Sequence, residues 1–256
     1  MAFIPDSRTY APGATADTAV LDAGLRAYML RVYNWMSSGL LLTGIVAYAV
    51  ANTSLINLFY HQVATPRGFA VQPTILGYAA IFAPLVFVMV LSFGVNRLSR
   101  SATQALFWAF AAVMGASLAN IFLIYQGASI ARVFFVTAAT FGAMSLYGYS
   151  TKADLSRMGS FLMMGLIGII VASLVNMFIG STMLQFAVSV IGVLIFVGLT
   201  AYDTQRIKGD YLQFAYAEGT DGAAKRSVFD ALSLYLNFIN LFMLLLQLFG
   251  SRNSNS

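Results

Sequence analysis

Five polar side chains recur along the last apolar segment of the sequence, at about 227–249. They are Asp230, Ser233, Asn237, Asn240 and Gln247, separated by three, four, three and seven residues. On a helix with 3.6 residues per turn this spacing puts all five on one stripe. The stripe should face other helices or water, because an unpaired polar group in hydrocarbon is expensive. Interhelical hydrogen bonding and the lining of a polar pathway both remain open.

A lone carboxylate, Asp203, ends the apolar segment before it, in the stretch GLTAYDTQRIKGD at 198–210. If the helix stops near there, its dipole disfavours a carboxylate by about 0.3–1 kcal/mol, so helix stability does not explain the residue. One interpretation is an interfacial salt bridge to Arg206, one turn further on. The other is a functional acid that exchanges protons or holds Ca²⁺, since an acid in or near the membrane is a functional candidate.

The composition indicates a membrane protein. Of the 256 residues, 59% are hydrophobic and 9% are charged, whereas soluble domains carry roughly 25% charged residues. The absence of cysteine excludes disulfides and thiolate metal sites, and the single histidine, His61, cannot supply a zinc or copper ligand set. We expect no bound cofactor beyond a possible Ca²⁺ ion, no nucleic-acid partner and no enzymatic activity.

Seven segments are long and apolar enough to span a bilayer as helices of about 20 residues. We expect an all-α, seven-helix transmembrane domain at 28–250, a cytoplasmic N-terminal tail at 1–27 and a short C-terminal tail at 251–256. The expected spans are 28–51, 75–95, 103–125, 131–149, 159–179, 183–203 and 227–249.

The basic residues fix the expected orientation, because cytoplasmic loops are rich in Lys and Arg. With the N-terminus inside, eleven basic residues fall on the cytoplasmic side and three on the other side, and the C-terminus is outside. A bacterial inner membrane is the expected location. The cytoplasmic set is Arg8, Arg26, Arg31, Arg97, Arg100, Lys152, Arg157, Arg206, Lys208, Lys225 and Arg226; the other is Arg67, Arg132 and Arg252.

This topology brings Arg97, Asp203 and Asp230 to the same level of the bundle, while Asn237 lies about 10 Å deeper than Asp230 at 1.5 Å per residue. Carboxylates closed by an arginine would form a proton-sensitive latch. Acid weakens their hold on the arginine, and a divalent cation could replace it.

Two stretches, GLTAYDTQRIK at 198–208 and LSLYLNFINLF at 232–242, resemble the Bax inhibitor-1 family. The resemblance implies seven helices with the seventh at the centre, and a pH-sensitive calcium leak gated by acids on the sixth and seventh helices. It matches Asp203 to the sixth-helix acid and Arg97 to the arginine that pairs with it. The second acid of the sensor is replaced here by Asn237, which brings neither charge nor proton.

The resemblance also implies an alternative function. Some bacterial family members are linked to regulation of a membrane-anchored AAA protease. A non-conducting regulator that binds such a protease, or another membrane protein, is therefore the second hypothesis, with the N-terminal tail as its docking element.

Overall fold

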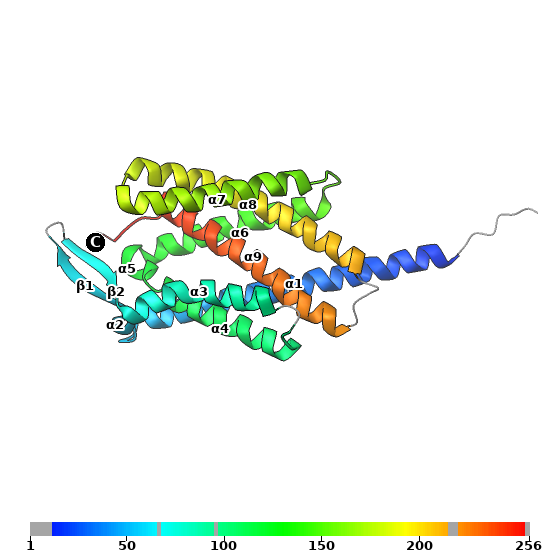
Figure 1. The fold of residues 1–256 in the computed structure, drawn as a ribbon, viewed down its shortest axis with the longest axis horizontal. Coiled ribbons are helices and arrows are strands. Elements are labelled where there is room, and N and C mark those ends of the chain that lie inside the picture. The colour runs from blue at the N-terminus through cyan, green and yellow to red at the C-terminus, as the bar shows by residue number, and fades with distance from the viewer. Residues whose placement is uncertain (1–11, 66–67, 95–96, 215–219, 254–256) are drawn as a thin grey trace, which may run out of the picture.

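The computed structural model describes residues 12–65, 68–94, 97–214 and 220–253, and the long helices run side by side along one axis (Figure 1). A small hairpin and the last described residues lie at one end of this bundle, and the start of the first helix lies at the other. The elements are α1 (Pro12–Ala51), α2 (Ile56–Phe59), β1 (Tyr60–Thr65), β2 (Gly68–Pro73), α3 (Ile75–Gly94), α4 (Arg100–Leu118), α5 (Ile121–Ile124), α6 (Gly127–Ser150), α7 (Ser156–Ile179), α8 (Thr182–Phe214) and α9 (Thr220–Phe249).

Within the described residues, six helical stretches are long and apolar enough to cross a membrane. The predicted second span corresponds to α3, which is continuously apolar only over Ile75–Leu91 and contains Pro84. Proline lacks the backbone N–H that a helix interior uses. The protein is thus a multi-pass helical membrane protein, while the number seven stays a prediction. The six stretches are Val20–Ala51, Arg100–Ile124, Gly127–Ser150, Ser156–Ile179, Thr182–Phe214 and Gly222–Phe249.

Two helices extend beyond the ends expected from hydropathy. Helix α1 begins at Pro12, inside the predicted tail 1–27, of which residues 1–11 lie outside the described part. Helix α8 continues to Phe214 instead of stopping at 203, because Ile207 is fully buried and keeps the polar extension packed on the core. The dipole argument for Asp203 is therefore wrong, since the effect is confined to the last turn of a helix.

The connection at 52–74 departs from the all-α prediction, because β1 and β2 pair as an antiparallel hairpin from Tyr60↔Pro73 to Thr65↔Gly68. Outside the hydrocarbon, backbone groups need not be paired within a helix. Tyr60 anchors the hairpin: it is 2% exposed and its hydroxyl donates to the Ser117 carbonyl at 2.6 Å. Burial raises the pKa of Tyr60 to about 12, so the hydroxyl stays a donor. His61 lies in β1 and is exposed.

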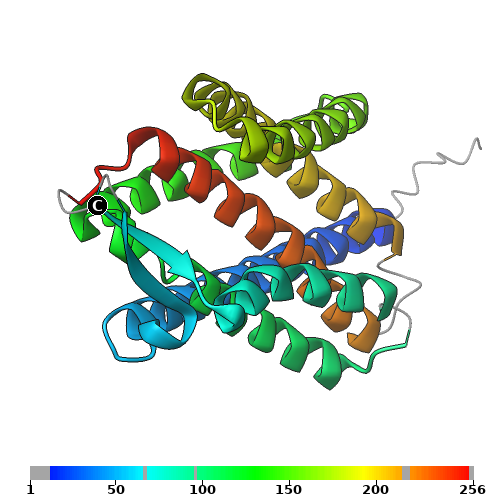
Figure 2. The same ribbon diagram turned by 60° about the vertical axis from the view of Figure 1, so that its left-hand side comes forward.

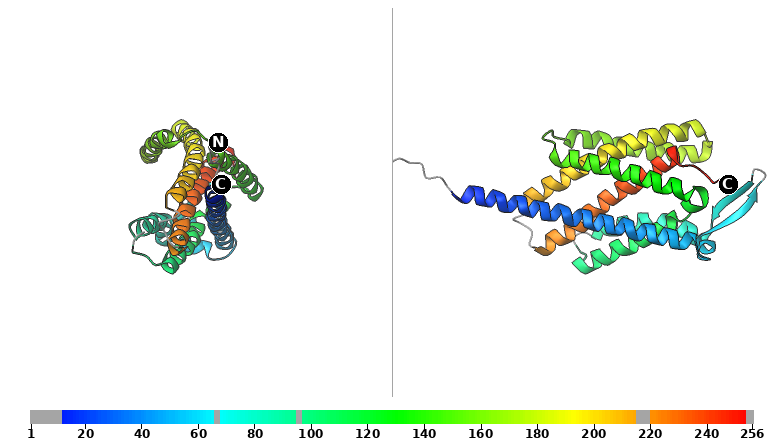
Figure 3. Two further views of the ribbon diagram at one scale, coloured as in Figure 1. Left: turned by 90° about the vertical axis from the view of Figure 1, so that its right-hand side faces the viewer. Right: turned by 180° about the vertical axis from the view of Figure 1, so that it is seen from behind.

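Helix α9 is the most buried of the six membrane-crossing stretches. Half of the residues in its most apolar stretch of 18 are buried, against 6% for α7 and at most 39% for the other membrane-crossing helices. It packs against α1, α4, α6 and α8, and crosses the bundle between them (Figures 2 and 3). Tyr235 of α9 is fully buried between the rings of Phe107 and Phe110, and its hydroxyl hydrogen-bonds with Thr43 at 2.7 Å. Helix α9 therefore fixes how its four neighbours are arranged, and with them the polar groups below.

Candidate functional site

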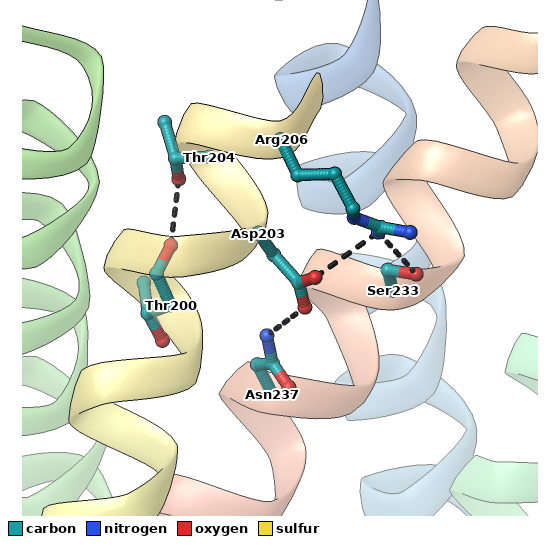
Figure 4. A network of polar contacts seen from close by, with 6 residues as sticks. All are labelled: Thr200, Asp203, Thr204, Arg206, Ser233 and Asn237. Atoms are coloured by element: carbon teal, nitrogen blue, oxygen red, sulfur yellow. Dashed lines mark hydrogen bonds and ion pairs between the residues drawn. The ribbon is translucent and has the colours of Figure 1, made fainter. Parts of the chain in front are cut away.

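Asp203 joins α8 to α9 through its carboxylate, as Figure 4 shows. The side chain is 15% exposed, although it lies within a membrane-crossing stretch. Asn237 of α9 donates a hydrogen bond from Nδ2 to Oδ2 of Asp203 at 2.7 Å. The depth expected from the spacing, which put Asp230 rather than Asn237 level with Asp203, is therefore wrong, and the position that the resemblance assigned to the second acid carries an amide in contact with Asp203.

Arg206 occupies the other oxygen of the same carboxylate. Its Nη2 lies 3.0 Å from Oδ1 of Asp203, one turn earlier on α8, and 3.4 Å from the hydroxyl of Ser233 on α9 (Figure 4). The Nε of Arg206 is buried and has no hydrogen-bond partner among the described residues. An unpaired buried donor is unfavourable by about 1–3 kcal/mol, so the guanidinium is held without being fully satisfied.

Both carboxylate oxygens of Asp203 are thus already in use, and this limits the chemistry of the cluster. A cation that binds these oxygens would share the carboxylate with Arg206 and Asn237 or compete with them for it. In the described part of the chain, no three His, Asp or Glu side chains gather as a metal site would require. Protonation, by contrast, needs no vacant position and removes the charge that attracts Arg206. The arrangement is suited to a proton-dependent contact between two helices.

Asp230 makes a separate contact, between α9 and α1. The Tyr28 hydroxyl donates to Oδ2 of Asp230 at 2.5 Å, and both side chains are buried. The Tyr28 ring also packs on Tyr211 of α8, with centroids 4.9 Å apart. Sequence reasoning missed Tyr28, because a tyrosine at the edge of an apolar segment carries no sign of a buried carboxylate partner far along the chain.

The remaining residues of the predicted stripe have different surroundings. Asn240 is exposed and donates to the carbonyl of Leu236 in its own helix. Gln247 accepts a hydrogen bond from Ser189 of α8 at 2.5 Å. The stripe therefore supplies interhelical contacts at Asp230, Ser233, Asn237 and Gln247, but Asn240 turns away from them.

The structure does not bring Arg97 to the carboxylate. Arg97 is exposed, and the described partners of Asp203 are Arg206 and Asn237. The arginine latch expected from the resemblance is absent from this conformation. Arg206, which the sequence offered as the simpler salt-bridge partner, pairs with Asp203 instead, because one helical turn places i and i+3 side by side.

Comparison with known proteins shows the family. A family model described as Inhibitor of apoptosis-promoting Bax1 matches residues 25–254. The inner membrane protein YbhL of Escherichia coli is 48% identical over 230 residues, covering 90% of this chain and 94% of YbhL. An uncharacterised protein of Caulobacter vibrioides is 47% identical over 248 residues, covering 95% of this chain and 97% of its own. An uncharacterised protein of Rickettsia prowazekii is 46% identical over 239 residues, covering 93% and 95%. The family match extends from within α1 to beyond the end of α9 and includes the Asp203 cluster, and the chain belongs to the Bax inhibitor-1 family.

Proposed function

We propose that the protein is a proton-sensitive calcium leak of the cell inner membrane. The observation that supports this most directly is the Asp203 carboxylate, which is largely buried and joins α8 to α9 through Asn237 and Arg206. The proposal assigns the protein no catalytic role and requires no bound cofactor. Calcium is the permeant ion, and protons set how often the path opens.

The gating step follows from the partners of Asp203. When the carboxylate takes up a proton it loses its attraction to the Arg206 guanidinium, and the contact between α8 and α9 weakens. A charge-assisted hydrogen bond is worth about 1.5–3 kcal/mol, so this loss can shift the balance between two bundle arrangements. Calcium reaching the cluster would compete with Arg206 for the same oxygens. Residues Ser233 and Asp230, on the same helix, would line the path as the helices separate.

The proposed topology has seven spans, with α3 as the short second one and α9 surrounded by the rest. The 20 residues of α3, Ile75–Gly94, are sufficient for a bilayer at 1.5 Å per residue. The excess of basic residues on the side of the N-terminus, eleven against three, favours a cytoplasmic N-terminus and a C-terminus on the other side. In this topology Asp203 lies near the cytoplasmic side of the membrane.

Calcium flux into liposomes, measured from pH 5 to pH 8, tests the proposal. We expect wild-type flux to depend on pH, and Asp203→Asn to remove that dependence because the amide cannot titrate. Asp154→Asn is the matched control: Asp154 is exposed in a loop, and hydrogen bonds from the side chain and then the backbone N–H of Ser156 lower its pKa. It should leave the flux profile unchanged. Absence of flux, or an identical profile in the Asp203 variant, would refute the proposal.

A non-conducting regulator is the second candidate, and one observation favours it. Both Asp203 oxygens are occupied, and Asn237 supplies an uncharged partner where a sensor pair would have an acid. The partner would be a membrane-anchored AAA protease or another membrane protein, docked through residues 1–11. Co-purification of a defined protease with the full chain, lost on deletion of residues 2–11 and accompanied by no calcium flux, would favour this candidate over the leak.

A further inference from the structure

A groove between α1 and α4 lies apart from the Asp203 cluster. It has a volume of about 630 Å³ and combines one cation, two indole rings and two small polar side chains. Neither the proposed leak nor the proposed regulator makes use of it. Its principal lining residues are Leu30, Arg31, Asn34, Trp35, Ser38 and Trp108.

The groove holds both tryptophans of the chain. Trp35 of α1 and Trp108 of α4 lie with ring centroids 5.6 Å apart, and Trp108 is 38% exposed. Within the described part of the chain, neither indole N–H donates a hydrogen bond to another residue. Tryptophan concentrates where hydrocarbon meets the headgroups, because its ring is apolar and its N–H is a donor.

The depth of the groove agrees with that position on both helices. About 20 helical residues cross the hydrocarbon. Counted back from the ends of the two membrane-crossing stretches, at Ala51 and Ile124, 20 residues reach Val32 on α1 and Ala105 on α4. Arg31 then lies just outside the hydrocarbon, and Trp35 and Trp108 lie just inside it.

The charge of the lining selects the headgroup. Arg31 is exposed, and its guanidinium has no hydrogen-bond or ion-pair partner among the described residues. The lining contains no carboxylate, so nothing is present to receive the ammonium of a zwitterionic lipid. An arginine guanidinium binds phosphate oxygens in a planar, two-pronged geometry.

We propose that this groove is a binding site for an anionic glycerophospholipid. Arg31 holds the phosphodiester, Asn34 supplies a polar contact beside it, and one acyl chain lies along Leu30 and the two indole rings. The site ties a lipid to the α1–α4 pair and is independent of whether the protein conducts ions.

Tryptophan fluorescence tests the site directly, because both of the chain's tryptophans line it. The full-length protein is reconstituted in phosphatidylcholine bilayers with increasing mole fractions of brominated phosphatidylglycerol or brominated phosphatidylcholine, both of which quench indole. We expect the anionic lipid to quench at about fivefold lower mole fraction, which corresponds to about 1 kcal/mol for one arginine at the membrane surface. Arg31→Gln should abolish this preference, so that both lipids quench at the same mole fraction. Quenching by brominated phosphatidylcholine should stay as in the wild type, which would show that the fold is intact.

Arg157→Gln is the matched control, because Arg157 is an exposed arginine in the first turn of α7, away from the groove. It should retain the wild-type preference. Equal quenching by the two lipids in the wild type, or an unchanged preference in Arg31→Gln, would overturn the proposal. Relief of the quenching by millimolar glycerol 3-phosphate would also overturn it, because the groove would then be a site for a soluble anion.

Discussion

Replacing Asn237 with aspartate tests the central contact of the cluster. Asn237→Asp exchanges a hydrogen-bond donor, 2.7 Å from Oδ2 of Asp203, for a second carboxylate. Two unit charges about 4 Å apart repel by about 4 kcal/mol at an effective dielectric constant of 20. The lost hydrogen bond adds about 1.5–3 kcal/mol. Arg206 offsets part of the repulsion between the two carboxylates. Its side chain is 37% exposed, however, so water screens its attraction to Asp203 about as much as in a surface ion pair.

Uptake of one proton by the pair limits the penalty, so we expect the variant to lose about 2–4 kcal/mol of stability at pH 8 and much less at pH 5. At acid pH the shared proton forms an O–H···O⁻ hydrogen bond between the two carboxyl groups. Thermal unfolding in detergent, followed by circular dichroism at both pH values, measures this difference. At about 2–4 °C per kcal/mol the expected shift is about 4–16 °C at pH 8.

Two companion variants make the result interpretable. Asn237→Leu removes the hydrogen bond without adding charge, so at pH 8 its stability loss should be limited to the contribution of that bond, about 1.5–3 kcal/mol, without the repulsion that Asn237→Asp adds. The double variant Asp203→Asn with Asn237→Asp exchanges the two groups and restores one donor and one acceptor. It should recover most of the stability lost by Asn237→Asp alone. If Asn237→Asp and Asn237→Leu behave alike at both pH values, the two side chains are not in contact and the reasoning about the cluster fails.

Two further changes test contacts elsewhere in the bundle. Tyr28→Phe removes the hydroxyl that donates to Asp230 and leaves a buried carboxylate with one fewer donor. We expect a loss of about 1.5–3 kcal/mol in thermal unfolding at pH 7, and an unchanged midpoint would mean that this contact contributes nothing. Gly148→Ala places a methyl group against the backbone of Ala201, where α6 and α8 approach closely, and should destabilise by about 1–3 kcal/mol. Gly142→Ala on the same helix adds its methyl group in open space and is the control; equal midpoints for the two would contradict the close approach.

The sequence predicted the helical membrane bundle because each apolar run must satisfy its own backbone inside lipid. It did not predict where α8 ends, since Arg206 and Lys208 are polar but are also good helix formers. The hairpin at β1 and β2 was missed for a related reason. For a segment outside the hydrocarbon, hydropathy does not distinguish a helix from a strand.

Periodicity placed Asp230 level with Asp203 and Asn237 about 10 Å deeper, whereas the structure pairs Asp203 with Asn237. Only the family resemblance pointed to Asn237 as the second sensor position. Periodicity could not decide whether Arg97 or Arg206 pairs with Asp203. That choice depends on how far each side chain reaches and on where α3 ends. Periodicity also placed Asn240 on the stripe, but Asn240 is exposed and donates to the carbonyl of Leu236 in its own helix. The pairing of Tyr28 with Asp230 joins the first and last long helices, and no local pattern reveals such a distant partner.

The position of α9 has a consequence for biogenesis. The helix that contacts α1, α4, α6 and α8 follows all of them along the chain and is synthesised after them. Until α9 is inserted, the earlier helices therefore lie in the bilayer without the partners that α9 supplies to Tyr28, Thr43 and Asp203. Completion of the bundle therefore follows the synthesis of the other described helices. A ribosome that stalls before the thirty residues of α9 would leave an unfinished assembly with exposed polar groups, which quality-control proteases can recognise.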